Sequence, residues 1–168
     1  MLKIGDKLPS APVQEFVEVA GNGCSIGPNG FDAAAAAAGK TVAIFALPGA
    51  FTPTCSAQHA PGYIQQAEAL KAAGADEIWC LSVNDAFVMG AWARELGAAG
   101  KVRFIADGSA EFTRATGLTL DLQARGMGLR SQRYSMLVVD GVVKTLNVEA
   151  PGKFEVSGAE TMLAQLKA

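Results

Sequence analysis

The chain has 168 residues, of which half are hydrophobic and 18% are charged, a composition typical of one folded domain rather than of a disordered segment. The net charge of −2 gives no electrostatic reason to expect nucleic acid or an anionic membrane as a partner. No apolar run is long enough for a membrane-spanning helix. The three cysteines, Cys24, Cys55 and Cys80, are unlike a secreted disulfide framework, and residues 1–6 lack an apolar signal core, so we expect a cytoplasmic protein.

The N-terminal part predicts an extended arm, a strand and a short helix. Glycine and prolines punctuate the arm at residues 2–12, and residues 13–19 alternate as in a strand. Residues 21–30 are rich in Gly, Asn and Pro and predict a turn region. Asp32, followed by an alanine run and a closing glycine, predicts a helix over residues 32–39.

The middle of the chain alternates strands with helices. The strands are expected at residues 41–47, 77–83 and 102–106. The helices that follow them are expected at residues 53–73, 84–96 and 111–116, the second of them capped by Asn84 or Asp85. Pro61 and Gly62 should kink the first of these helices, because proline removes a helical hydrogen bond.

The C-terminal part predicts a hairpin and a closing helix. Two apolar runs, at residues 134–139 and 142–148, flank Asp140 and Gly141, a strong signal for a tight hairpin turn. Residues 157–166 have the spacing of an amphipathic helix. The whole order predicts an α/β fold with a mixed β-sheet covered by helices on both faces, in a single domain over residues 1–168.

The most informative segment joins the strand at residues 41–47 to the helix that follows it. Cys55 lies at this junction, where the unpaired N–H groups of a helix start favour thiolate over thiol. Pro53 suits the first helical turn. Thr52 stands where the first cysteine of a redox Cys-x-x-Cys pair would be, so the junction offers one nucleophile with a neighbouring hydroxyl.

A helix start alone does not activate a thiol sufficiently. Lowering a thiol pKa by about two units requires roughly 2.7 kcal/mol of preferential thiolate stabilisation, whereas a helix N-terminus supplies about 0.3–1 kcal/mol, or about 2 when partly buried. We therefore expect a full cation beside the sulfur. Arg133 opens a predicted strand, which would hold its guanidinium rigidly, and Arg130 lies three residues upstream in looser sequence.

With these features in place, the chain resembles the peroxiredoxins of type II, the peroxiredoxin-five-like group. The resemblance rests on residues 48–56, on His59 with Pro61 and Gly62, and on residues 82–85, 107–108 and 130–135. It implies a thioredoxin-like fold and a thiol-dependent peroxidase that reduces hydrogen peroxide and alkyl hydroperoxides through a sulfenic acid on Cys55. It also implies recycling by glutaredoxin and glutathione or by thioredoxin, and a homodimer. No cofactor is expected.

The resemblance places the active-site arginine at Arg133, which would stabilise the thiolate and the departing oxygen. Arg130 is then expected to be a surface or interface charge. The Thr52 hydroxyl would accept from and donate to substrate and thiolate, and Pro48 would shield the sulfur and fix the loop. His59, four residues after Cys55 on the same helical face, is expected to be a packed, hydrogen-bonded neighbour rather than a general base.

Two cysteines and three aromatic residues leave alternatives open. Cys80 follows Cys55 at a spacing found in part of the type II group, but it falls in the middle of a predicted strand, about 10 Å below the rim. A disulfide with Cys55 would then need local unfolding, so we favour a buried core thiol over a resolving cysteine. Cys24 matches no role. Phe51, Phe87 and Trp92 could line the pocket, form a subunit interface or simply belong to the core.

Three functions remain to be compared: a thiol peroxidase, a thiol–disulfide exchanger, and a redox sensor that signals through oxidised Cys55. The missing second sulfur at Thr52 argues against the exchanger. The single histidine and the lack of paired Cys/His spacing argue against a structural zinc site. The sequence therefore predicts a peroxidase with Cys55 as the nucleophile.

Overall fold

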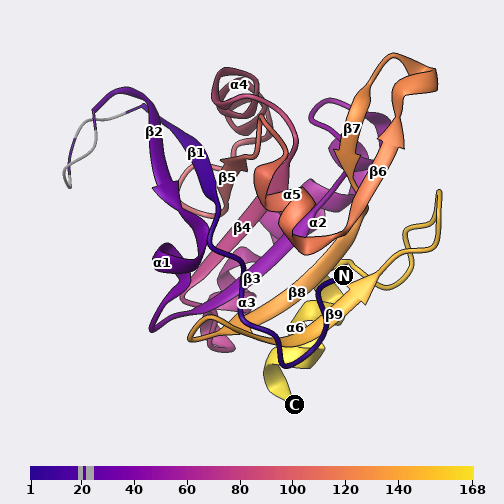
Figure 1. The fold of residues 1–168 in the computed structure, drawn as a ribbon. Coiled ribbons are helices and arrows are strands. Elements are labelled where there is room, and N and C mark those ends of the chain that lie inside the picture. Colours follow the sequence, from indigo (N-terminus) through magenta and orange to yellow (C-terminus); the bar gives the residue numbers. More distant parts are fainter. Residues whose placement is uncertain (19–20, 22–24) are drawn as a thin grey trace.

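A mixed seven-stranded β-sheet forms the centre of the protein, with strand order β2-β1-β5-β4-β3-β8-β9 (Figure 1). The computed structural model describes residues 1–18, 21 and 25–168, so that Cys24 lies outside the described residues. The strands of this sheet are β1 (Pro12–Val17), β2 (Gly27–Asp32), β3 (Thr41–Ala46), β4 (Glu77–Ser82), β5 (Arg103–Ala106), β8 (Tyr134–Val139) and β9 (Val142–Val148). The neighbours β3, β4 and β5 run parallel and the outer pairs run antiparallel, which confirms the predicted mixed sheet.

Helices cover both faces of this sheet. They are α1 (Ala33–Ala37), the π-helix η1 (Cys55–His59), α2 (Ala60–Gln65), α3 (Ala67–Ala72), α4 (Ala86–Leu96), α5 (Glu111–Thr116), the 3-10 helix η2 (Gln123–Arg125) and α6 (Ala159–Lys167). One apolar cluster packs the sheet against α2, α3, α4 and α6, and a second packs it against α1, α5 and the N-terminal arm. No helix within the described residues has the length and apolar character needed to cross a membrane.

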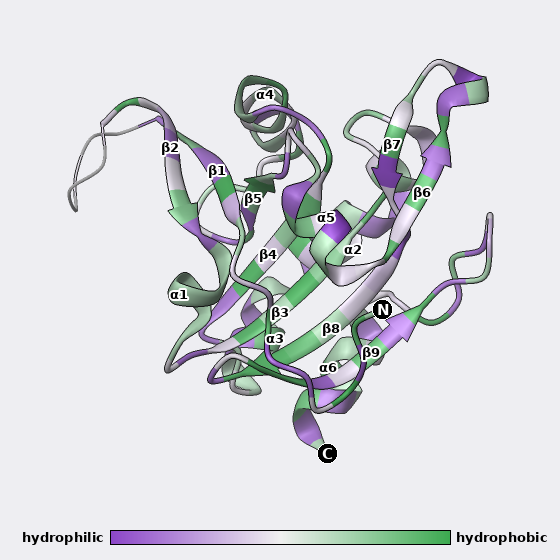
Figure 2. Ribbon diagram, in the orientation of Figure 1, coloured by the Kyte–Doolittle hydropathy of each residue, from purple (hydrophilic) through white to green (hydrophobic). Residues whose placement is uncertain are grey.

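Strand β3 shows how the sequence builds two cores with one strand. Val42, Ile44 and Ala46 belong to the cluster under α1 and α5. The alternate residues Ala43 and Phe45 belong to the cluster under α2 and α4. Because successive side chains of a strand point to opposite faces, an unbroken apolar run indicates a strand buried on both sides. Figure 2 shows the corresponding hydrophobic colouring along β3 and β4.

Two β elements differ from the sequence prediction. The predicted turn region contains the edge strand β2, which pairs with β1 from Gly27 to Asp32 despite its glycines and a proline. Pairing with a neighbouring strand outweighs the poor strand propensity of these residues, and an edge strand tolerates proline. A second sheet, the hairpin of β6 (Thr119–Leu122) and β7 (Gly128–Ser131), was not predicted.

The helix expected over residues 53–73 is divided. It begins at Pro53, adopts a π-helical turn from Cys55 to His59, and breaks at Gln66, whose backbone angles leave the helical range (φ −94°, ψ 4°). Pro61, where a kink was predicted, lies just after the π-helical turn inside a helix that runs without interruption from Pro53 to Gln65. Its missing N–H removes one helical hydrogen bond there, and π-helical turns of this kind are common sites of kinks.

Candidate active site

The loop between β3 and η1 is held from the neighbouring strand. The Ala50 N–H donates to Asn84 Oδ1 at 3.0 Å, and the Ser82 hydroxyl donates to the same oxygen at 2.6 Å. Asn84 therefore fixes the loop, while Asp85 caps α4 by accepting from the Val88 N–H. Next in the loop, Phe51 has a left-handed backbone (φ 64°), a conformation that costs about 1–3 kcal/mol and is found where a structure over-determines it.

Thr52 and Pro48 are tied into the same loop. The Thr52 hydroxyl donates to the Gly49 carbonyl at 2.7 Å, so its single proton is used and its lone pairs remain to accept. The Pro48 carbonyl accepts from Arg130 Nη1 at 3.2 Å. Both side chains are half-buried. Pro48 thus lies in a loop that hydrogen bonds hold in place. The predicted contacts of Thr52 with substrate and thiolate stay predictions.

Arg130, expected to be a surface or interface charge, packs against this loop from within the chain. It projects from β7, donates from Nε to the Met127 carbonyl at 2.8 Å, and is half-buried. A Cβ atom added to Gly49 would lie 2.7 Å from Arg130 Nη1, so the guanidinium packs directly on the loop backbone. The hairpin that carries Arg130 was not predicted, which is why this contact was missed.

Arg133 lies directly beside the cysteine. Its Nη2 donates to Cys55 Sγ at 3.0 Å. The sheet explains this position, because Tyr134, the first residue of β8, pairs with Ala46, the last residue of β3. The chain leaves β3 toward Cys55 and enters β8 from Arg133 at the same edge. The predicted pairing of this cation with this sulfur is therefore present in the structure, and a cation at this distance favours the thiolate.

His59 is fully buried between Arg133 and the C-terminal segment. Its Nε2 lies 3.0 Å from the Ser157 carbonyl and its Nδ1 lies 2.8 Å from Arg133 Nη1. A carbonyl only accepts, so Nε2 carries the proton and Nδ1 accepts from the guanidinium. Burial and the charge of Arg133 lower the pKa of His59 from 6.5 to about 3. His59 is thus packed and hydrogen-bonded beside the site, as predicted. It is also neutral, and its bonding leaves no free nitrogen for a general base.

The segment between β9 and α6 closes the site and was not identified from the sequence. The centroid of the Phe154 ring lies 4.9 Å from the centroid of the His59 ring. The same Phe154 centroid lies 5.9 Å from the guanidinium carbon of Arg133. The Ser157 carbonyl accepts from both His59 and the Tyr63 hydroxyl. This segment has no helical or strand periodicity, so it carried no sequence signal beyond its polar composition.

The charge of Arg133 is available to the sulfur. Within residues 1–18, 21 and 25–168, no ion pair joins Arg133 to a carboxylate, and the partner of its second nitrogen is the neutral His59. A carboxylate in that place would cancel most of the positive field. The same described residues contain no cluster of three or more His, Cys, Asp or Glu side chains able to hold a metal ion.

Cys55 has no exposed surface. It faces inward from the first turn of η1 into the cluster that includes Leu47 and Ala60. Arg133 touches the sulfur and is itself only half-buried, so the sulfur lies one side chain below the surface. Contact between this sulfur and any molecule from solvent therefore requires neighbouring side chains to move.

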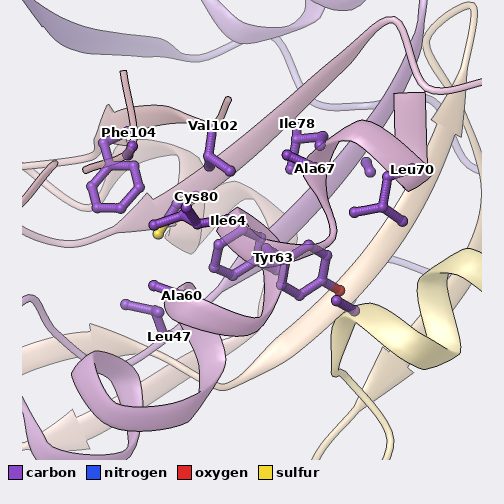
Figure 3. Close-up of a cluster of buried hydrophobic side chains, with 14 of the residues drawn as sticks. Leu47, Ala60, Tyr63, Ile64, Ala67, Leu70, Ile78, Cys80, Val102 and Phe104 are labelled. Atoms are coloured by element: carbon purple, nitrogen blue, oxygen red, sulfur yellow. The ribbon is translucent and has the colours of Figure 1, made fainter. Parts of the chain in front are cut away.

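Cys80 occupies the middle of β4, deep in the sheet. It pairs with Phe45 of β3 and Phe104 of β5, and its side chain lies under α2 among Leu47, Ile64 and Phe104 (Figure 3). Both Cys55 and Cys80 are free. Burial raises the pKa of Cys80 well above its ordinary value, and the neighbouring Cys55 adds to this. The position agrees with a neutral core thiol.

The three aromatic residues separate into one core and two surface positions. Trp92 is buried and donates from Nε1 to the Ser56 hydroxyl at 3.0 Å, directly after the cysteine. Phe51 lies against Trp92 and is 51% exposed, and Phe87 is 65% exposed. Trp92 therefore supports the helix start from below, whereas the two phenylalanines present apolar surface.

Comparison with known proteins agrees with this geometry. The sequence matches the Redoxin family over residues 3–163. Peroxiredoxin-2B of Arabidopsis thaliana is 52% identical over 130 residues, which cover 77% of this chain and 80% of that protein. A Burkholderia cenocepacia crystal structure, described as a thioredoxin reductase, is 64% identical, with a TM-score of 0.98 over 100% of this chain and 99% of that one.

A third relative is a crystal structure of a complex with hydrogen peroxide. The reduced Prx3 of Vibrio vulnificus in complex with hydrogen peroxide is 49% identical, with a TM-score of 0.91 over 99% of each chain. The fold, the match over nearly the whole chain and these relatives lead to one assignment. The chain belongs to the redoxin family, in which it is a peroxiredoxin of the type II, peroxiredoxin-five-like group and hence a thiol-dependent peroxidase.

Proposed function

We propose that Cys55 is the nucleophile that attacks the hydroperoxide. The supporting observation is the 3.0 Å contact between its sulfur and a guanidinium that no described carboxylate neutralises. The thiolate forms a bond to one peroxide oxygen while the O–O bond breaks. The sulfur is oxidised to sulfenic acid, the second oxygen leaves with the electron pair of the broken bond, and a proton from solvent completes the water or alcohol.

Neighbouring groups would stabilise this transition state. Arg133 faces the thiolate and, because its guanidinium is planar with several donors, can also stabilise the negative charge on the departing oxygen. The N–H of Cys55 belongs to the first helical turn, where such groups lack intrahelical partners, and is a second donor. The Thr52 hydroxyl, which donates to the Gly49 carbonyl, accepts a hydrogen bond from the O–H of the incoming peroxide. Pro48 fixes the loop around the sulfur.

The sulfenic acid is then reduced by an external thiol. That thiol forms a mixed disulfide with Cys55 and releases water, and a second thiol frees Cys55. The burial of Cys80 in mid-strand supports this one-cysteine cycle over a Cys55–Cys80 disulfide. Glutaredoxin with glutathione, or thioredoxin, is the proposed physiological donor.

Thiol–disulfide exchange is the second candidate, raised by the description of the Burkholderia relative. Such exchange usually relies on a pair of nearby cysteines. The hydroxyl of Thr52 stands where the second sulfur would be, which favours the peroxidase. A redox sensor would be oxidised by peroxide without turnover.

A cytoplasmic homodimer is also proposed. Phe51 in the loop before η1 and Phe87 in α4 are large exposed apolar side chains. Apolar surface of this kind is often covered by a partner subunit. The free state of Cys55 and Cys80 fits a reducing compartment. Sedimentation of the wild type and of a Phe87→Glu variant tests the dimer, because a buried charge at the interface would shift the equilibrium to monomers.

A mass-spectrometric map after one equivalent of peroxide tests the proposed chemistry. We expect sulfenic acid on Cys55, trapped by a dimedone-type reagent, and catalytic peroxide consumption when a glutathione-based donor is supplied. Cys55→Ser should abolish both signals. Oxidation without turnover under either donor would support the sensor, and a Cys55–Cys80 linkage would support a two-cysteine cycle.

A further inference from the structure

Glu149 is a buried carboxylate that the proposed reaction does not use. It follows β9 directly and is 7% exposed. Its oxygens accept from the backbone N–H groups of residues 155–157 at 2.8–3.0 Å and from the Ser157 hydroxyl at 2.6 Å. Burial alone would raise the pKa of this carboxyl, but these donors outweigh burial, so the pKa of Glu149 lies below its usual value. The charged form thus organises the segment folded around it.

That segment contacts the active site through the Ser157 carbonyl. The N–H and hydroxyl of Ser157 bind Glu149, while its carbonyl accepts from His59 Nε2 at 3.0 Å. The other nitrogen of His59 accepts from Arg133 Nη1, and Arg133 Nη2 reaches Cys55. A second link runs through the backbone, because the Glu149 N–H donates to the Arg133 carbonyl at 3.0 Å.

We propose that Glu149 is a positioning residue for Arg133: by fixing the Ser157 carbonyl it orients His59, and His59 aims the guanidinium at the Cys55 sulfur. The backbone link fixes the base of the same arginine side chain. The inference rests on the proposed role of Arg133 in stabilising the thiolate. It adds a residue that does not touch the sulfur and that no sequence motif around Cys55 indicates.

The direction in which neutralising Glu149 shifts the thiol–thiolate equilibrium of Cys55 separates positioning from simple electrostatics. A negative charge near a thiol disfavours thiolate, so removing the charge of Glu149 would by itself favour thiolate. Loss of positioning acts in the opposite direction, because a misaligned guanidinium stabilises the thiolate less. A substitution that neutralises Glu149 and disfavours thiolate therefore reports on the alignment of Arg133.

The test is a double-mutant cycle between Glu149→Gln and Arg133→Ala, in the full-length reduced protein. The glutamine keeps the shape of the side chain but replaces one accepting oxygen with an NH₂ group that faces N–H donors. The matched control is Glu155→Gln, an exposed carboxylate on the same segment. The readouts are the pH midpoint of Cys55 ionisation, followed by thiolate absorbance against a Cys55→Ser blank, and the rate constant for hydrogen peroxide.

We expect Glu149→Gln to raise the midpoint by about half a pH unit or more and to slow the reaction about threefold or more, while Glu155→Gln changes neither. In the Arg133→Ala background, Glu149→Gln should add little further change, since the residue acts through that arginine. An unchanged or lowered midpoint in folded Glu149→Gln, or fully additive effects, would overturn the inference.

Further results distinguish failure of the Glu149 inference from failure of the proposed role of Arg133 and from loss of folding in the variant. If Arg133→Ala itself titrates as the wild type does, the proposed role of Arg133 fails. If Arg133→Ala shifts the midpoint and Glu149→Gln does not, only the positioning inference fails. Should Glu149→Gln not fold, Ser157→Ala removes one donor to the carboxylate and keeps the carbonyl, and we expect a smaller rise in the same direction; no rise would overturn the inference.

Discussion

Replacing Arg133 with alanine tests the central contact of the site. The substitution removes the only described side-chain donor to Cys55 Sγ and the donor to His59 Nδ1 together. A hydrogen bond to a charged group contributes about 1.5–3 kcal/mol. Arg133 is half-buried, so solvent screening favours the lower end of this range. Because one pH unit corresponds to 1.36 kcal/mol, the midpoint of Cys55 ionisation should rise by about one unit.

The reaction with peroxide should slow by more than the ionisation alone implies. The thiolate fraction near neutrality falls with the shifted midpoint, and the departing oxygen also loses its cationic partner. We expect the second-order rate constant to fall more than tenfold, equivalent to about 1.4 kcal/mol or more. Stopped-flow fluorescence follows the reaction, since Trp92 is hydrogen-bonded to Ser56 beside the reacting sulfur.

Two comparison variants make this result specific. Arg125→Ala removes an exposed arginine and should behave as the wild type. Arg133→Lys keeps the charge but cannot bond to His59 and Cys55 with a planar fork, so it should fall between wild type and alanine. If folded Arg133→Ala ionises and reacts as the wild type does, the assignment of Arg133 is wrong.

Three other predictions concern separate parts of the site. Cys80→Ser should keep peroxide turnover with a glutathione-based donor, measured by coupled NADPH consumption, because the thiol is buried in mid-strand; loss of turnover in the folded variant would make Cys80 the resolving residue. Thr52→Val should slow peroxide attack about three- to tenfold, as expected for a lost hydrogen bond of about 0.5–1.5 kcal/mol, while Thr52→Ser stays near wild type; equal rates for both would contradict the accepting role. Finally, His59 stays neutral in the folded protein down to about pH 3, whereas in the unfolded chain it takes up a proton near pH 6.5. The free energy of unfolding should therefore decrease as the pH falls from about 6.5 to about 3, by up to about 1.4 kcal/mol per pH unit. Chemical denaturation at several pH values should show a shallower slope for His59→Gln, and an unchanged slope would contradict a neutral buried imidazole.

Local sequence patterns were sufficient to predict the reactive junction. A β-branched strand is followed within a few residues by a proline at the helix start, and Cys55 comes two residues after that proline. The sheet then brings Arg133 to the same edge through the pairing of Tyr134 with Ala46, a contact that the order of strands makes plausible. The nucleophile was thus predicted from the junction itself, whereas the choice of Arg133 over Arg130 came from the resemblance to the type II peroxiredoxins.

The residues that support the site depend on contacts that local patterns do not encode. Arg130 reaches the Pro48 carbonyl 82 positions away, from a hairpin without a strong strand signal. Glu149 precedes an irregular segment whose structure is defined by hydrogen bonds to that one carboxylate rather than by periodicity. Asn84 or Asp85 was expected to cap the helix; Asp85 does so, whereas the bond of Asn84 to the loop at Ala50 appears only once the two strands lie side by side.

The pairing of Arg133 with an uncharged imidazole makes the electrical balance of the site depend on the oxidation state of one sulfur. Thiolate and guanidinium cancel before the reaction, whereas a neutral sulfenic acid leaves the cation without a counterion. We therefore expect the oxidised enzyme to attract an anionic donor thiol. Regeneration by a charged thiol should then weaken with ionic strength more than regeneration by an uncharged one.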